Sequence, residues 1–265
     1  MFFMEPFDSY IIFSDYDGTL GRKKVISEKN LEAVRYFQQN GGLFTIATGR
    51  FREFFRSFEP DFVPNTYMIT SSGAIIYDIN TDEIIYKRPA DRAILDTVCE
   101  ALPLMQGVLD VLLFSENDSV KIDFSEPDLY ERIRSVPFTV FKVLIHVPRE
   151  QELSDIDKKI LEQIAGDRYI VTRSWVGGVE IQARDSDKGH AIDHVMSLLG
   201  EEGKKRKIIC IGDYENDISM FDHVDVSYAV EDAFDAVKER ATRVTVPFDQ
   251  DAIAALIADI ENGRI

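Results

Sequence analysis

Two aspartates separated by one residue follow a short apolar run near the start of the chain. Asp15 and Asp17 belong to the segment Asp-Tyr-Asp-Gly-Thr, directly after the run 10–14. In extended backbone, side chains two positions apart point to the same side, and the glycine that follows permits a tight turn. An ordinary surface turn is the alternative, because Asp-Gly is a common turn pair. A calcium loop of the D-x-D-x-D-G type is excluded, since that register would need glycine where the chain has Leu20.

A second acidic group follows another apolar run late in the chain. Asp213, Glu215 and Asp217 come after the run 207–211, and Asp217 stands one helical turn beyond Asp213 on the same face. Crowded carboxylates need a cation or a proton to coexist. Mg²⁺ is the natural partner, because it takes a few carboxylates and keeps its other positions for water and substrate phosphate. A solvated acidic loop is the weaker alternative.

Two further segments offer groups that can hold a phosphate. Thr48 ends the run 43–48 and Gly49 follows it, at the expected start of a helix, where a hydroxyl and a backbone N–H can bind an anion. An ordinary N-cap is the alternative there. Arg50 comes next and could reach either the substrate or an inserted segment. Lys188 follows Asp187, which fits an N-cap, so this lysine lies in a first helical turn where the helix dipole disfavours a cation. A bound anion would explain that position, and a solvated surface lysine is the alternative.

The elements that would position these residues alternate between strands and helices. Short apolar runs, typical of strands buried on both faces, occur at 10–14, 43–48, 67–70, 207–211, 226–230 and 243–246. Ser27 precedes an amphipathic stretch that stops at Gly41-Gly42, which predicts a capped helix. Such alternation predicts βαβ units in a parallel sheet. Ligands of open parallel sheets bind beyond the carboxyl ends of the strands, where all four segments would lie.

The middle of the chain has a different pattern. Two predicted hairpins join 107–114 to 119–124 and 169–176 to 179–183, while 90–104 and 151–165 have helical periodicity. We expect an inserted α+β domain at 84–182 within a core formed by 1–83 and 183–265. Within the second hairpin, Arg173 could meet a second charged group of a substrate. Trp175 could stack on a sugar ring, although core packing is the more common role of a tryptophan.

Composition limits the class of protein. With 265 residues and 45% apolar content, the chain can bury a sizeable core. Its 30 Lys and Arg against 47 Asp and Glu give a net charge of −17, which opposes binding to nucleic acid or anionic lipid. The two cysteines match no metal-ligand spacing, and no apolar run reaches the length of a bilayer span. We expect a cytoplasmic protein that takes a small anionic ligand through a local positive group.

The four segments, in this order, resemble the four motifs of the haloacid dehalogenase-like superfamily of phosphatases. The motifs would be DYDGT, the Thr of ATGR, the Lys of DKGHAI, and GDYENDISM. The last of these, with the large insertion, looks like the Cof-type subgroup. The resemblance implies a Rossmann-like parallel-sheet core with an inserted α+β cap of the C2 type, Mg²⁺ as cofactor, and a phosphorylated sugar or similar small metabolite as substrate.

The resemblance also implies a role for each matching residue. Asp15 would be the nucleophile and Asp17 the general acid and base. The metal site would consist of Asp15, the backbone carbonyl of Asp17, Asp213 and Asp217. The phosphate and the substrate would be held by Thr48, Gly49, Arg50, Lys188 and Asn216.

The chain departs from the subgroup at Ser71-Ser72-Gly73-Ala74, where Asn-Gly-Ala is usual, and at Val230-Glu231-Asp232-Ala233. Neither departure touches the expected catalytic groups, but both leave the substrate open. A phosphomutase or phosphotransferase would use the same aspartyl-phosphate, and a noncatalytic metal-binding or receiver-like module would keep the acidic cluster for signalling. A dehalogenase is disfavoured, because its halide leaving group does not need the proton that Asp17 would supply. The oligomeric state is not readable from the chain.

Overall fold

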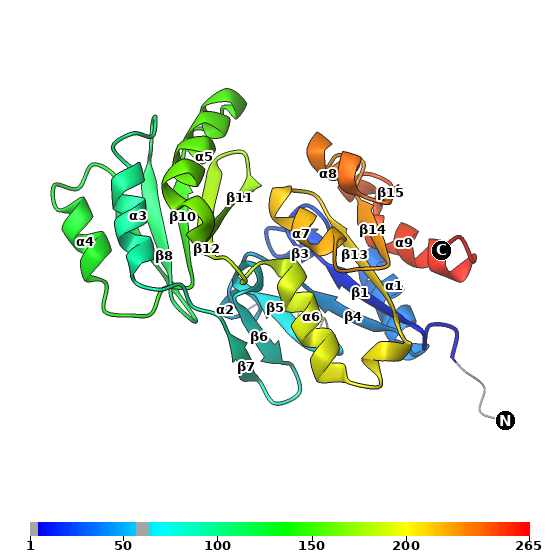
Figure 1. Ribbon diagram of the computed structural model, residues 1–265. Coiled ribbons are helices and arrows are strands. Elements are labelled where there is room, and N and C mark those ends of the chain that lie inside the picture. Colours follow the sequence, from blue (N-terminus) through cyan, green and yellow to red (C-terminus); the bar gives the residue numbers. More distant parts are fainter. Residues whose placement is uncertain (1–4, 57–63) are drawn as a thin grey trace.

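The fold has two neighbouring groups of elements, each built around its own sheet. The computed structural model describes residues 5–56 and 64–265, and Figure 1 shows the two groups side by side. One sheet is parallel and takes its strands from both ends of the chain, whereas the other is antiparallel and takes its strands from the middle. The predicted α/β fold with a parallel-sheet core is therefore confirmed.

The parallel sheet has five strands, with β1 next to its centre. Its order is β15 (Arg243–Val244), β14 (Val226–Ala229), β13 (Lys207–Gly212), β1 (Tyr10–Ser14) and β4 (Leu43–Ile46). Every neighbouring pair runs parallel. Apart from Tyr10 and Ile208, which are partly buried, the apolar side chains of β1 and β13 are buried on both faces of the sheet, which accounts for their continuous apolar sequences.

Helices cover both faces of this sheet. α1 (Glu28–Gln39) packs against α9 (Ala252–Glu261) on one face, while α6 (Lys188–Leu199), α7 (Ile218–Phe221) and α8 (Asp235–Arg240) lie on the other (Figure 1). Both predicted N-caps are confirmed. The Ser27 side chain accepts a hydrogen bond from the Asn30 N–H, and the Asp187 side chain accepts one from the His190 N–H. These caps fix where α1 and α6 begin.

The predicted strand at 67–70 joins a small antiparallel sheet instead of the main one. β5 (Met68–Thr70) pairs with β6 (Ile75–Asp78), which pairs with β7 (Glu83–Lys87). Among the described residues, a single parallel bridge between Ala47 and Ile69 connects β5 to the main sheet. Shorter elements complete this half of the molecule: the hairpin β2 (Gly21–Arg22) and β3 (Val25–Ile26), and α2 (Glu53–Arg56).

We call residues 93–183, which contain the second large sheet, the antiparallel unit. Its strand order is β11 (Tyr169–Trp175), β12 (Gly178–Ala183), β10 (Lys142–His146), β8 (Asp110–Phe114) and β9 (Ser119–Asp123). Both predicted hairpins, β8–β9 and β11–β12, are confirmed. Its helices are α3 (Ala93–Ala101), α4 (Leu129–Ser135) and α5 (Gln151–Ala165). The sequence predicted α5 with these bounds, extended α3 at both ends, and missed α4 and β10.

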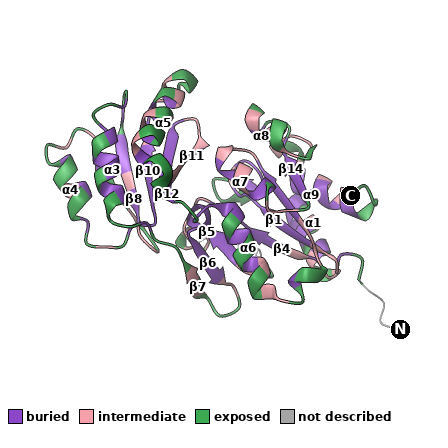
Figure 2. Ribbon diagram, viewed as in Figure 1, coloured by how far each residue is buried: buried purple, intermediate pink, exposed green. Residues whose placement is uncertain are grey.

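The two faces of the antiparallel sheet differ in chemistry. Val143, Ile145, Val179 and Ile181 point into an apolar core that they share with the helices. The alternate positions Lys142, Glu180 and Gln182 are polar and are also buried. Figure 2 shows the strands of this sheet largely in purple, the colour of buried residues. A strand alternates its side chains between faces, so these polar groups share the face opposite the helices. Among the described residues, no helix is long and apolar enough to cross a bilayer.

Candidate active site

The four segments singled out in the sequence meet at the carboxyl ends of the parallel strands. Lys188, in the first turn of α6, places its Nζ 2.6 Å from Asp15 Oδ1, which follows β1. The same Nζ lies 2.6 Å from Asp217 Oδ1, beyond β13. The lysine side chain is fully buried. Burial alone would lower the pKa of Lys188, but these two carboxylates raise it above its ordinary value, so the ammonium stays charged.

Three carboxylates form a compact cluster around this ammonium. Asp15, Asp213 and Asp217 each offer an oxygen, and these oxygens all lie within 4.8 Å of one another. Burial raises the pKa of Asp15 to about 7, although Lys188 opposes the shift. Burial and the neighbouring Asp15 raise the pKa of Asp213 well above its ordinary value. Burial therefore disfavours the charged forms of Asp15 and Asp213, and the donors of the cluster are all oxygen, which matches the preference of a hard dication.

Two glycines make room for the acidic cluster. A side chain on Gly212 would collide with Asp217, and a side chain on Gly18 would collide with Asp213. Gly18 also has a φ of +90°, which few other residues adopt. The backbone fixes the carboxylate of Asp217, because its Oδ2 accepts hydrogen bonds from the N–H groups of Asp213 at 2.9 Å and Tyr214 at 3.1 Å. The close approach of these groups therefore depends on glycine in both motifs.

Asp17 lies near the cluster but its carboxylate is directed elsewhere. Arg50 Nε donates to Asp17 Oδ2 at 2.5 Å, and Arg50 Nη2 donates to Oδ1 at 2.7 Å. Both side chains are partly exposed, at 37% and 39%. The side chains of Asp15 and Asp17 therefore have different partners, a buried ammonium and a partly exposed guanidinium. The spacing in the sequence predicted that Asp15 and Asp17 lie close together, but it did not predict that they pair with different cations.

The segment Thr48–Arg50 is a loop, and the predicted helix start at Thr48 is wrong. α2 begins only at Glu53. The carbonyls of Thr48 and Arg50 accept hydrogen bonds at 2.9 Å from the N–H groups of Ser72 and Ser71. These two carbonyls are thus bonded to a distant segment and not to N–H groups four residues ahead, as they would be in a helix. A methyl group on Gly49 would lie 3.9 Å from Asn216 Nδ2, so Asn216 adjoins this loop.

A polar network behind the loop was not found from the sequence. Lys142 Nζ donates to the Gly49 carbonyl at 3.0 Å and to Glu180 Oε1 at 3.1 Å. Ser72 Oγ donates to Glu180 Oε2 at 3.0 Å, and Gln182 Nε2 donates to the Ser72 carbonyl at 3.1 Å. Lysine and glutamate are rarely buried, so a sequence reading assigns both to the surface. The available signal was Lys142 directly before the apolar residues 143–145, and Glu180 between Val179 and Ile181.

Arg173 does not lie free for a substrate, contrary to the suggestion from the sequence. It pairs with Glu215 of the loop between Asp213 and Asp217, and its Nη1 lies 2.6 Å from Asp155. The arginine side chain is only 3% exposed. Arg173 therefore joins the antiparallel unit to residues 213–217, which we call the acidic loop. Trp175 packs against His146, at 5.5 Å between ring centroids, and under the Arg149 guanidinium at 4.9 Å, all within the antiparallel unit.

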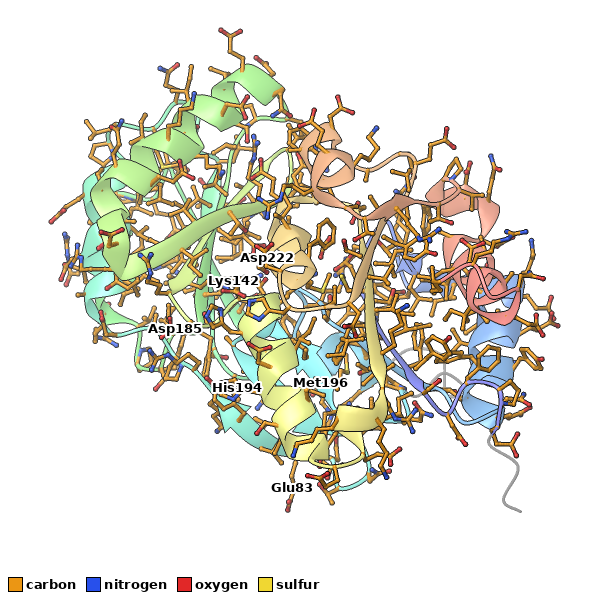
Figure 3. The ribbon with its side chains drawn as sticks, turned by 45° about the vertical axis from the view of Figure 1, so that its right-hand side comes forward. Glu83, Lys142, Asp185, His194, Met196 and Asp222 are labelled. Atoms are coloured by element: carbon orange, nitrogen blue, oxygen red, sulfur yellow. The ribbon has the colours of Figure 1, made fainter. Side chains whose placement is uncertain are left out.

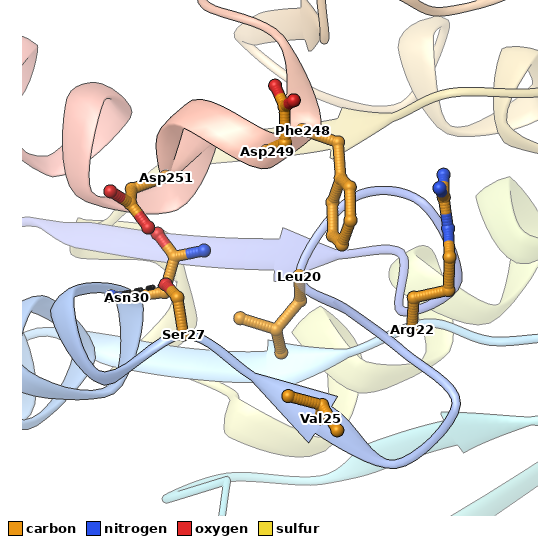
Figure 4. Close-up of a pocket in the computed structure, with 8 residues that line it drawn as sticks. All are labelled: Leu20, Arg22, Val25, Ser27, Asn30, Phe248, Asp249 and Asp251. Atoms are coloured by element: carbon orange, nitrogen blue, oxygen red, sulfur yellow. Dashed lines mark hydrogen bonds between the residues drawn. The ribbon is translucent and has the colours of Figure 1, made fainter.

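A pocket of about 240 Å³ lies away from the acidic cluster. Figure 4 shows it between the β2–β3 hairpin, the start of α1 and the segment before α9, with Leu20, Ser27, Phe248 and Asp251 among its lining residues. None of the residues predicted to act in catalysis lines it. We assign it no role.

Comparison with known proteins identifies the family. The sequence model of the haloacid dehalogenase-like hydrolase family matches residues 12–257. The chain belongs to this family. A 5-amino-6-(5-phospho-D-ribitylamino)uracil phosphatase of Bacillus subtilis is 26% identical, and the match covers 96% of each chain. The predicted enzyme class is thereby confirmed.

Solved structures show the same fold. A haloacid dehalogenase subclass IIB sugar phosphatase superposes with a TM-score of 0.76 at 21% identity, over 97% of this chain and 100% of the other. A haloacid dehalogenase-like hydrolase of B. subtilis gives 0.75 at 19% identity, over 94% and 98% of the two chains. At such identities the likeness concerns the fold alone.

Proposed function

We propose that this enzyme is a Mg²⁺-dependent phosphatase that hydrolyses a small phosphorylated metabolite through a phosphoryl group carried by Asp15. The observation that supports this most strongly is the position of Lys188, buried between Asp15 and Asp217 inside a cluster of oxygen donors. A fixed cation and a nucleophilic carboxylate at one point are what phosphoryl transfer needs, since that reaction depends mainly on positioning and charge neutralisation.

The residues present fit a magnesium ion. Asp15 and Asp213 would hold it, together with the backbone carbonyl of Asp17, and Asp217 would support it while its Oδ2 stays bonded to backbone N–H groups. When bound, Mg²⁺ supplies positive charge to the phosphoryl oxygens as negative charge builds up on them. The raised pKa values of Asp15 and Asp213 support this assignment, because each carboxylate is poorly stabilised without a dication.

The reaction follows from the roles of two carboxylates. Asp15 attacks the phosphorus atom, a bond forms between its carboxylate oxygen and phosphorus, and the bond from phosphorus to the ester oxygen breaks. Asp17 gives a proton to the departing alcohol. It then takes a proton from the water that attacks the phosphoryl group on Asp15, which releases phosphate and restores the carboxylate. Lys188 and the loop Thr48–Arg50 hold the phosphoryl oxygens throughout.

The Arg50–Asp17 pair must open for this cycle to run. Its two hydrogen bonds occupy both oxygens of the Asp17 carboxylate. A phosphate group is a competing partner of higher charge, and arginine binds phosphate through two parallel N–H bonds. We therefore assign Arg50 to substrate binding, with Asp17 released when the ester arrives.

We also propose that residues 84–182 form a cap that excludes water and contacts the part of the substrate beyond the phosphate. The Arg173–Glu215 pair, which joins the antiparallel unit to the acidic loop, supports closure at this place. The names of the relatives, a ribitylamino-uracil phosphatase and a sugar phosphatase, favour a phosphate ester on a sugar or polyol as substrate. The cytoplasmic location and the absence of a nucleic-acid partner stay predictions from the sequence.

A screen of phosphate esters tests the proposal. Sugar phosphates, polyol phosphates, nucleotides and p-nitrophenyl phosphate are incubated with Mg²⁺, and free phosphate is measured. We expect release from at least one sugar or polyol ester, abolition by EDTA, and no release by the variant Asp15→Asn. Transfer of the phosphoryl group to a second alcohol instead of water would indicate a phosphotransferase. No release from any ester would contradict the proposal.

A further inference from the structure

Three successive carbonyl groups of the phosphate-binding loop are held by three donors from two different parts of the molecule. The Thr48 carbonyl accepts from the Ser72 N–H and the Arg50 carbonyl from the Ser71 N–H, both at 2.9 Å. The carbonyl between them, that of Gly49, accepts from Lys142 Nζ at 3.0 Å. Two donors therefore belong to the backbone of the core, and the middle donor is a side chain of the antiparallel unit.

The fold explains why this lysine arrives there. In the register of β10 and β12, Lys142 stands opposite Gln182, and Leu144 stands opposite Glu180. Lys142, Glu180 and Gln182 thus share the sheet face turned away from the helices. All three bond to Ser72 of the core: Lys142 Nζ at 3.2 Å and Glu180 Oε2 at 3.0 Å to its Oγ, and Gln182 Nε2 at 3.1 Å to its carbonyl. Figure 3 shows Lys142 where the antiparallel unit meets the part of the molecule that contains the parallel sheet.

The core segment that meets these groups has an unusual backbone. Ser71 and Ser72 have φ values of 51° and 57°, in the left-handed region that non-glycine residues seldom adopt. Such conformations persist where surrounding contacts determine them, and they concentrate at functional sites. Ser71 and Ser72 have such contacts on two sides. Their N–H groups bond to the loop 48–50, and the Ser72 side chain bonds to Glu180 of the antiparallel unit.

The bond to Gly49 fixes a peptide plane next to the site. In a trans peptide the carbonyl and the following N–H point in opposite directions, and the described residues contain no cis peptide bond. The N–H of that plane belongs to Arg50 and donates to Thr48 Oγ1 at 3.2 Å. Lys142 therefore sets the orientation of the peptide that carries Arg50 and restrains the Thr48 hydroxyl. The burial of Lys142 and Glu180, with side chains 2% and 3% exposed, keeps water from replacing this bond.

We propose that Lys142 is a positioning residue, which completes the phosphate-binding loop only while the cap rests on the core. Withdrawal of the cap removes the donor from Gly49 and the partners from Ser72, so the loop holds a phosphate firmly in the closed state alone. Phosphate binding and cap closure are thereby coupled through one ammonium group. The kinetic part of this inference rests on the proposed phosphatase activity, whereas its structural part does not.

The test compares two lysines of the same sheet. Lys142→Met/Glu180→Gln removes the donor without leaving a buried carboxylate unpaired, and Lys121→Met is the matched control, because Lys121 is 61% exposed on β9. With Mg²⁺, kcat and KM are measured for p-nitrophenyl phosphate and for a sugar phosphate, along with inhibition by orthovanadate. We expect kcat/KM of the double variant to fall about 10- to 100-fold, by the same factor for both esters, with vanadate inhibition weakened in parallel. A loss confined to one ester, or a lower melting temperature with unchanged kinetics, would overturn the proposal.

Hydrogen exchange gives a second reading that needs no activity. The amides of residues 48–50 are followed by mass spectrometry in the parent, the double variant and Lys121→Met. We expect exchange in this segment to be about 10-fold faster in the double variant alone. Equal exchange in all three proteins would refute the positioning role. If the parent hydrolyses no ester at all, the proposed phosphatase function fails, and this exchange measurement still decides the role of Lys142.

Discussion

Arg50 binds both carboxylate oxygens of Asp17, with its Nε 2.5 Å from Oδ2 and its Nη2 2.7 Å from Oδ1. This pair joins the first motif to the second. Asp15, which also belongs to the first motif, contacts Lys188 of the third motif and clusters with the acidic loop of the fourth. The guanidinium also lies over the Phe54 ring, 3.9 Å from its centroid, which restricts where it can move. Arg50 therefore bonds to both oxygens of Asp17 while its own position is restricted by Phe54.

Replacement of Arg50 should weaken substrate binding. We expect Arg50→Gln to lower kcat/KM about 10- to 100-fold, mainly through KM, because a charge-assisted two-point contact to phosphate is lost. The matched control is Arg52→Gln, since Arg52 pairs instead with Asp82. Steady-state kinetics on p-nitrophenyl phosphate provide the measurement. Equal kinetics for the two variants would show that Arg50 serves only to hold Asp17.

Mg²⁺ should stabilise the protein more at high pH than at low pH. The pKa of Asp15 is raised to about 7 in the folded protein, against about 3.9 in an unfolded chain. A raised pKa gives stability that is complete below the unfolded value and is lost as pH rises through the folded value. The metal-free protein should therefore lose stability between about pH 4 and 7, and a bound dication should offset that loss. Melting temperatures at pH 5 and pH 8, with Mg²⁺ or EDTA, test this. An increment from Mg²⁺ that is equal at both pH values, or none, would contradict it.

Loss of Arg173 should destabilise the folded protein, because this arginine joins the antiparallel unit to Glu215 of the other half of the molecule. Its side chain is 3% exposed, and it pairs with Glu215 and Asp155. Removing one partner of a buried ion pair commonly costs about 3–5 kcal/mol, because the other charge stays buried. We expect Arg173→Met to lower the free energy of unfolding by about that amount in urea titration. Arg184→Met is the control, since Arg184 is 57% exposed. Equal stability of the two variants would mean that the pair opens in solution.

The sequence predicted the parts of this molecule that depend on local patterns. Continuous apolar runs identified β1 and β13, and capping residues located the starts of α1 and α6. The carboxylates and Lys188 could be predicted to meet because each follows a parallel strand or begins a helix at one edge of the sheet. Proximity in the site thus followed from topology.

What the sequence did not predict depends on contacts between distant segments. Thr48 was expected to start a helix, but donors from Ser71 and Ser72 hold the loop carbonyls. Lys142 is a buried cation inside a strand, and only the pairing of β10 with β12 brings it to Glu180. Arg173 was considered for a substrate, yet Glu215 neutralises it across the junction. In each case the partner lies at least 18 residues away along the chain. The shortest of these separations is the one between Arg173 and its second partner, Asp155.

In the proposed mechanism the phosphoryl group passes through Asp15, and Asp17 donates and accepts the protons. The variant Asp17→Asn tests both parts. p-Nitrophenolate leaves without a proton, so this variant should still form the phosphoenzyme but hydrolyse it slowly, with turnover reduced about 10²- to 10⁴-fold. The measurement is the mass of the Asp15 peptide after reaction with p-nitrophenyl phosphate and an acid quench. We predict one added phosphoryl group on that peptide, and none when Asp15 is replaced by Asn as well. Turnover near the parent rate with no added mass on Asp15 would contradict the account.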